Sequence, residues 1–184
     1  MKEIFLSFKP KYFKPLLYGM KKYEYRKRFC NEDVRAYLYL SDSKKEVIGY
    51  MDLLKPLRID CIKDSLHAYP DTLKRVEHYI QKRDIYAIPI KNLVLFKKPL
   101  TLAEIRKIIP NFMPPQMYYI LENNLGLKDL LKKQELDYKV FEHNHSDIYY
   151  DNLAMSVQDM EETEEFIKLE ETHKLKGSFS SIHF

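Results

Sequence analysis

Glycine is scarce in this chain of 184 residues, which has four: Gly19, Gly49, Gly126 and Gly177. No two of them stand close enough to build a phosphate-binding loop. The dinucleotide-binding pattern G-x-G-x-x-G and the P-loop of nucleoside triphosphatases are therefore absent. The nucleophile pattern G-x-S-x-G of the α/β-hydrolases is absent as well. These absences argue against three common classes of enzyme.

Cysteine and long apolar runs are also few. The two cysteines, Cys30 and Cys61, fit no C-x-x-C or zinc-binding spacing, and we expect no metal and no other cofactor. The N-terminus lacks the apolar stretch of a signal peptide, and no run approaches the roughly 20 apolar residues that cross a bilayer. We therefore predict a cytoplasmic protein with reduced thiols and no membrane partner.

Charge is present in both signs but is unevenly spread. The chain has a formal net charge of +4. Residues 1–28 hold nine Lys and Arg against two acids, whereas residues 159–171 hold seven acids against one lysine. The sequence thus combines a basic N-terminal part with an acidic C-terminal segment.

Hydrophobic periodicity predicts alternating strands and helices up to about residue 135. The strands are expected over residues 3–8, 21–28, 34–41, 46–54 and 85–96. The helices are expected over residues 11–18, 57–69, 71–83, 101–109, 116–123, 127–134 and 153–175. Strand signals become rare after residue 135, so we predict a domain over 1–134 and a partly helical, acidic extension over 135–184, with a loose end.

Particular residues are predicted to mark helix ends and one strand irregularity. Asp71 is expected to cap a helix, and Thr101 with Glu104 forms a T-x-x-E capping box. Gly126 is expected to end the helix over 116–123. Pro89 predicts an edge or a bulge in its strand.

The stretch KKYEYRKR over residues 21–28 carries the most chemical information. In a strand, Lys22, Glu24, Arg26 and Arg28 would share one face, with the tyrosines on the other. Such a row is costly to bury unpaired, so it must face solvent or a polar cleft. It is either a solvated face on which Glu24 pairs with a neighbouring cation, or a phosphate-binding surface.

The order of residues around this stretch resembles the ASCH family of the PUA-like superfamily. The first block of the resemblance consists of Leu6, Ser7, Lys9, Pro10, Tyr12, Gly19, Lys21, Glu24, Arg26, Lys27 and Arg28. It continues through residues 37–41, 48–50, 86–88 and 114–116 and covers roughly residues 3–125. The core of the pattern is G-x-K-x-x-E-x-R, which we call the signature (residues 19–26).

The resemblance implies an α/β (α+β) fold: a PUA-like ASCH β-barrel with peripheral helices, which the helical C-terminal extension would follow. It also implies a cleft beside the signature that binds RNA or a nucleotide-like ligand. We expect this cleft to be basic and the role of the protein to be regulatory. The residues expected to bind are Ser7, Lys9, Lys21, Glu24, Arg26, Arg28 and Ser41.

Two enzymatic alternatives stay open. Some family members resemble acetylcytidine amidohydrolases, which use a lysine, a threonine and a further glutamate. Lys21 matches the lysine, Glu24 stands in the threonine position, and Glu77 is a candidate only by region. Other members are ribonucleases, in which Lys21 or Tyr39 would transfer a proton or stabilise charge. If the protein is an enzyme, Lys21 and Glu24 are its expected catalytic residues.

Further features have modest interpretations. His143 and His145 lack a third ligand at a suitable spacing and are expected to be surface loop residues without a metal. Tyr118 is a candidate for the edge of the cleft. The acidic helix is a possible docking surface for a protein partner, which makes an interaction module the third functional hypothesis. The same helix could instead cover the basic cleft when RNA is absent.

Overall fold

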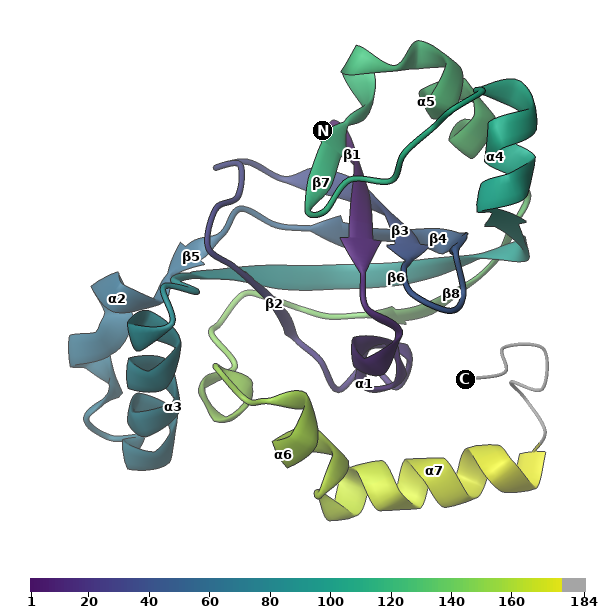
Figure 1. Cartoon of the computed structure of the whole chain (residues 1–184). Helices are drawn as coiled ribbons and strands as arrows, with labels where there is room; N and C mark the ends of the chain where they lie inside the picture. The colour runs from purple at the N-terminus through teal and green to yellow at the C-terminus, as the bar shows by residue number, and fades with distance from the viewer. Residues whose placement is uncertain (177–184) are drawn as a thin grey trace.

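A computed structural model describes residues 1–176 and shows a mixed α+β fold (Figure 1). One sheet, in the order β2-β6-β4-β3-β1-β7, curls into a half-barrel, and β5 and β8 also pair with β6. The strands are β1 (Lys2–Phe8), β2 (Tyr23–Arg26), β3 (Val34–Leu40), β4 (Glu46–Leu53), β5 (Leu57–Arg58), β6 (Tyr86–Thr101), β7 (Tyr118–Ile120) and β8 (Leu136–Glu142).

The signature lies in the connection between two parallel strands. β1 and β3 pair in parallel, so the chain must cross over between them. The crossover contains the 3-10 turn η1 (Pro10–Tyr12), helix α1 (Phe13–Leu17) and strand β2. Gly19 follows α1 with φ +68°, a left-handed conformation that glycine adopts without steric cost. The turn at Gly19 leads from α1 into β2.

Strand β6 organises the sheet. Its first residues pair with β2 and β5, and its remaining length pairs with β4 and β8. The predicted irregularity near Pro89 is present as a register shift in the pairing with β4, where Leu53 lies opposite Ile90. β4 approaches β6 very closely at Gly49, where a Cβ atom would stand 2.1 Å from the Val94 carbonyl oxygen.

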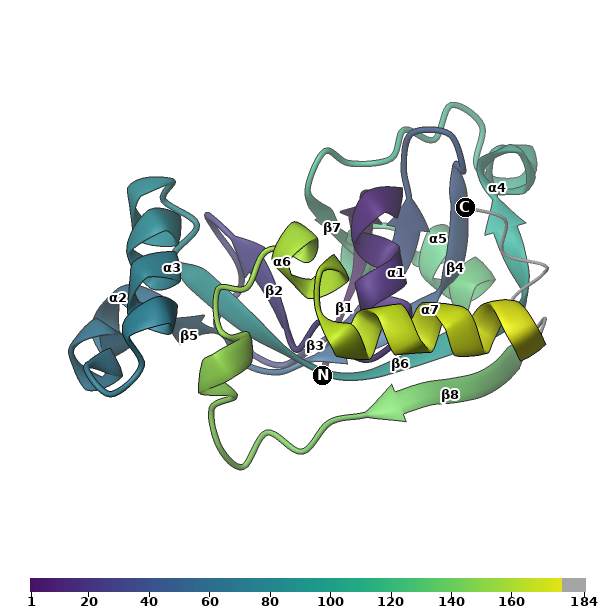
Figure 2. The same ribbon diagram turned by 90° about the horizontal axis from the view of Figure 1, so that it is seen from below.

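Helices bury three separate apolar clusters against this sheet. The first packs Phe13, Leu16 and Leu17 of α1 against the strands. The second lies under α4 (Leu102–Ile108) and α5 (Leu125–Lys132). The third joins α2 (Ile59–Ile62) and α3 (Pro70–Gln81) to β2 and to residues 148–154 (Figures 1 and 2).

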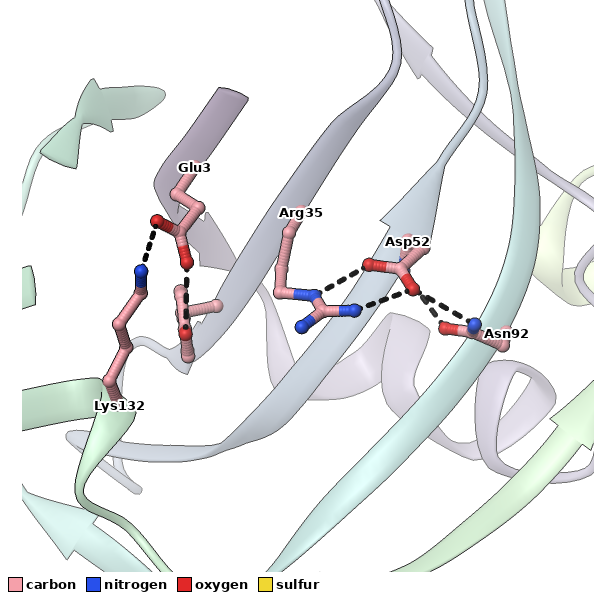
Figure 3. A network of polar contacts seen from close by, with 6 residues as sticks. Glu3, Arg35, Asp52, Asn92 and Lys132 are labelled. Carbon is pink, nitrogen blue, oxygen red and sulfur yellow. Dashed lines mark hydrogen bonds and ion pairs between the residues drawn. The ribbon is translucent and has the colours of Figure 1, made fainter. Parts of the chain in front are cut away.

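A polar ladder crosses neighbouring strands away from the signature (Figure 3). Arg35 on β3 donates from Nε and Nη2 to Asp52 on β4, at 2.8 and 3.0 Å. Asn92 on β6 donates to the same carboxylate at 3.0 Å and accepts from the Asp52 backbone N–H. Burial raises the pKa of Asp52, but the bonds from Arg35 and Asn92 outweigh burial and lower it below its ordinary value.

The C-terminal elements after β8 are the 3-10 turn η4 (Tyr150–Asn152), α6 (Val157–Glu161) and α7 (Glu164–Lys176). α7 lies beside α1 (Figure 2), where Glu170 pairs with Lys14 at 2.8 Å and accepts from the Tyr18 hydroxyl. The Phe166 ring meets the Tyr18 ring at 5.4 Å between centroids. The division at residue 134 stays a prediction, and the expected loose end lies outside the described residues.

Several expected elements differ in the structure. The helix expected over 57–69 is β5, α2 and the 3-10 turn η2 (Lys63–Leu66), and the helix expected over 116–123 is β7 followed by η3 (Leu121–Asn123). The helix expected over 153–175 is divided into α6 and α7, and β8 was not expected.

The structure confirms one of the expected helix ends and contradicts two others. The capping box of Thr101 and Glu104 is confirmed. The Asp71 side chain makes no cap, because α3 begins one residue earlier at Pro70. Gly126 lies inside α5 and ends no helix. Among residues 1–176, no helix is long and apolar enough to cross a bilayer.

Candidate functional site

The signature strand buries a compact group of three charges. The side chains of Lys21 and Glu24 are each 8% exposed, and Arg26 is 15% exposed. Lys21 Nζ lies 3.2 Å from Glu24 Oε2, and Arg26 Nη2 lies 2.9 Å from Glu24 Oε1. The expected pairing of Glu24 with a neighbouring cation is therefore confirmed, but the solvated strand face is wrong. Buried charges are tolerated here because each has a partner of opposite sign.

Backbone oxygens complete the surroundings of the two cations. Lys21 Nζ donates to the Tyr23 carbonyl at 2.7 Å, and Arg26 Nη2 donates to the Ser7 carbonyl at 3.3 Å. Arg26 Nε is buried and has no hydrogen-bond partner among the described residues. A buried donor without a partner is rare and costly.

Two clefts meet at the signature strand. The first has a volume of about 620 Å³. It is lined by Ser7, Phe8, Lys9, Tyr12, Glu24, Tyr25, Arg26, Tyr39, Ser41, Asp42, Lys45, Leu102, Arg106 and residues 114–116. The second, of about 650 Å³, extends between α3 and α6. Tyr12, Glu24 and Tyr25 line both, so the two clefts share a wall.

The clefts differ in charge. In the first, the four cations Lys9, Arg26, Lys45 and Arg106 stand against Glu24 and Asp42. In the second, Lys11, Lys21 and Lys82 are matched by Glu24, Asp84 and Glu161. Only the first cleft therefore has an excess of positive charge.

The predicted binding residues divide between these places. Ser7, Lys9, Glu24, Arg26 and Ser41 line the first cleft, as does Tyr39. Lys21 lines the second. Arg28 is exposed on a bend after β2 and lines neither of them.

The other candidates lie elsewhere. Tyr118 packs on Phe29 and does not line the clefts. Glu77 on α3 pairs with Lys63 of η2 and is likewise absent from both. Residues 164–172 of α7 line neither of the two clefts.

Comparison with solved structures decides the fold. No family model matches the sequence, and no curated protein matches it. The structure resembles the crystal structure of ASCH from Zymomonas mobilis, with a TM-score of 0.53 and 20% identity over 73% of this chain and 96% of that one. A serine-to-alanine variant of the Zymomonas protein matches with a TM-score of 0.51 and 20% identity, over 73% of this chain and 97% of that one. A tyrosine-to-phenylalanine variant matches with a TM-score of 0.53 and 19% identity, over 73% of this chain and 100% of that one. The chain has the ASCH fold.

In this ASCH fold the signature is braced from far along the chain. Asn152 donates from Nδ2 to the Met20 carbonyl at 2.9 Å and accepts from the Lys22 N–H at 3.1 Å. The hydroxyls of Tyr23 and Tyr25 accept from the backbone N–H groups of Tyr149 and Ala154, at 2.9 and 2.6 Å. Residues 149–154, which we call the brace, thus hold the entry into β2 and the side chains of both its tyrosines. No local pattern in the sequence pointed to Asn152.

The signature tyrosines are uncharged. Burial raises the pKa of Tyr23 to about 12 and raises that of Tyr25 well above its ordinary value. Burial likewise raises the pKa of Tyr79 to about 12, and its ring lies 4.5 Å from that of Tyr25. These rings therefore form a neutral aromatic wall beside the charged group.

His143 is also part of the support of the signature. It is buried, with Nδ1 2.8 Å from the Ile90 carbonyl oxygen and Nε2 2.9 Å from that of Gly19. His145 Nε2 lies 2.9 Å from the same Ile90 oxygen. Burial lowers the pKa of both histidines. The expectation of surface histidines is thus wrong for His143. Within residues 1–176 no three His, Cys, Asp or Glu side chains gather to hold a metal.

Proposed function

We propose that this protein binds RNA or a nucleotide-like ligand in the first cleft, with a regulatory role. The observation that carries the proposal is the first cleft, where the Arg26 guanidinium lies in a lining with an excess of positive charge. The resemblance to ASCH domains, a family associated with RNA, supports the same ligand class.

The cleft offers suitable groups for both parts of a nucleotide. Arginine binds phosphate with a planar pair of donors, and Lys9, Lys45 and Arg106 add positive charge around it. Tyr12 and Tyr25 present aromatic surface at the wall between the clefts. A base stacks on such rings with little sequence preference. Glu24 holds Arg26 in place and is a ready acceptor for a base amino group.

The test is a gel-shift and cleavage assay on labelled single-stranded RNA, with and without EDTA. We expect Arg26→Lys to weaken binding about ten- to a hundredfold, because lysine keeps the charge and loses the planar donors. Arg28→Lys is the matched control, since Arg28 lies outside both clefts. Equal effects of the two substitutions, or no shift by the unaltered protein, would contradict the proposal.

Hydrolysis is a second candidate function, favoured by the buried contact between Lys21 and Glu24. A lysine and a carboxylate at 3.2 Å can exchange a proton with a bound ligand. The same gel shows cleaved RNA directly, and chromatography of N-acetylated cytidine after incubation detects amide hydrolysis. Product that forms in EDTA and is lost in Lys21→Ala would assign catalysis to this pair. Its absence would leave binding alone.

A further inference from the structure

A shallow hollow continues the first cleft along α4. It has a volume of about 600 Å³ and is lined by Lys44, Lys45, Thr101, Leu102, Ala103, Arg106 and Lys107. Lys45, Leu102 and Arg106 line the first cleft as well. A ligand in the first cleft can therefore extend into this α4 hollow past a shared wall.

The wall is held in position by the backbone. The Leu102 N–H donates to the Lys45 carbonyl at 2.8 Å, which ties the turn between β3 and β4 to the start of α4. Arg106 Nε donates to the Phe112 carbonyl at 3.1 Å, which fixes the guanidinium at the junction. The capping box of Thr101 and Glu104 begins the helix beside them. The cations of the hollow thus sit on an ordered frame.

Basic side chains dominate the lining of the α4 hollow. No Asp or Glu stands among the described residues that line it, whereas the second cleft at the other side of the signature holds Asp84 and Glu161. Arg106 and Lys107 also suit the C-terminal end of a helix, where the dipole favours cations. That role does not require Lys45, which comes from a different element and faces the same hollow.

We propose that the α4 hollow binds the backbone phosphates of a single-stranded RNA whose first nucleotide is held at Arg26. The ligand is then a polynucleotide, and it leaves the cleft along α4 rather than across Tyr25 into the second cleft. The inference rests on the proposed function and specifies its ligand. Each neutralised phosphate of a single strand contributes about 0.7 to the slope of log affinity against log salt concentration.

The test is fluorescence anisotropy with labelled oligouridylates of two and eight nucleotides at several salt concentrations. We expect the unaltered protein to bind the octanucleotide about tenfold more tightly or better. The variant Lys107→Ala should reduce this gain and lose about 0.7 of the salt slope, while its affinity for the dinucleotide stays the same, because Lys107 lines the hollow and not the first cleft. Lys107 is exposed, so melting curves of the variant should match those of the parent.

Lys82→Ala is the matched control, because Lys82 is an exposed lysine of the second cleft. It should leave both affinities unchanged. Equal affinity of the unaltered protein for the two lengths would overturn the inference and leave the proposed function standing. An effect of Lys82→Ala as large as that of Lys107→Ala would also overturn it. Failure to bind either oligonucleotide would overturn the proposed function itself.

Discussion

Glu24 is the residue on which the charges of the site depend. It is the carboxylate that pairs with both Lys21 and Arg26, and all three side chains are largely buried. An ion pair of this kind adds little net stability, but removing one partner leaves an uncompensated charge in a poorly solvated place. The group is therefore sensitive to any change that neutralises Glu24.

We expect Glu24→Gln to lower the free energy of unfolding by about 3–5 kcal/mol, because Lys21 loses its carboxylate partner. Urea denaturation measures the change. Glu32→Gln is the control, since Glu32 pairs with Lys2 at the surface and should contribute at most about 1 kcal/mol. Similar losses for the two variants would show that burial of the pair does not matter.

Substitution of glycine by alanine is expected to have opposite effects on stability at Gly49 and at Gly126. At Gly49, with φ +153°, an added Cβ would stand 2.1 Å from a backbone oxygen of β6. Gly126 is inside α5, where the nearest atom to an added Cβ is 3.7 Å away. The first position has no space for a methyl group, and the second does.

We expect Gly49→Ala to cost about 3 kcal/mol or more, because β4 and β6 must move apart. Gly126→Ala should stabilise the protein by about 0.5–1 kcal/mol through helix propensity. Thermal melting of both variants checks the pair. A Gly49→Ala variant as stable as the parent would contradict the close strand approach.

Among the elements, the brace matters more for the site than the acidic helix does. If the acidic helix covered the cleft, as the sequence allowed, deleting residues 151–184 would raise RNA affinity. That deletion also removes Asn152 and Ala154, which hold β2 and the residues before it by hydrogen bonds between side chains and backbone groups. A truncation that tests the helix alone must therefore begin at Glu164.

We expect removal of residues 164–184 to leave the protein folded and RNA affinity unchanged. α7 contacts the α1 region, outside the clefts, and residues 164–172 line neither cleft. Removal of residues 151–184 should abolish binding, since β2 loses its support. Circular dichroism and anisotropy distinguish the two truncations. A rise in affinity after the shorter truncation would instead support a helix that competes with RNA.

Local sequence predicted the elements that local forces determine. The alternation of residues 21–28 gave β2, and the T-x-x-E pattern gave the start of α4. Residues 118–120 form a strand because Tyr118 to Ile120 pair with β1, a contact across more than a hundred positions. β8 is a strand because it pairs with β6. Pairing with strands so distant in the sequence cannot be detected from the local periodicity of hydrophobic residues.

The same distinction applies to the candidate site. The resemblance located Lys21, Glu24 and Arg26, and the structure shows them in contact. It did not indicate Lys45 and Arg106, which reach the first cleft from a turn and a helix outside the signature. Nor did it indicate Asn152, whose contribution is to backbone groups. These residues are distant from the signature in the sequence, and only the folded structure brings them to the site.

For the molecule as a whole, His143 couples stability to pH. Burial lowers its pKa in the folded state below the usual value of 6.5, with further lowering from Lys22 and His145. The unfolded chain therefore binds the proton more readily, and stability is full above about pH 6.5 and falls as the pH drops below it. His145 shifts in the same direction.

We expect the melting temperature to fall between pH 7.5 and pH 5.5, and to fall less in His143→Gln. The glutamine variant should be less stable than the parent at pH 7.5, because it loses a buried contact between Gly19 and Ile90. His67→Gln serves as the control, since His67 is exposed. Equal pH dependence in His143→Gln and the parent would assign the effect to other groups.

The pairing of β6 has a consequence for how the chain acquires its function during synthesis. β2 gains its strand partner only when residues 86–89 have been made, and its brace only when Asn152 and Ala154 follow. Contacts between such distant positions form late, because a long loop must first close. A ribosome must thus translate beyond Ala154 before the nascent product can form the site, so we expect products that terminate earlier to bind no ligand.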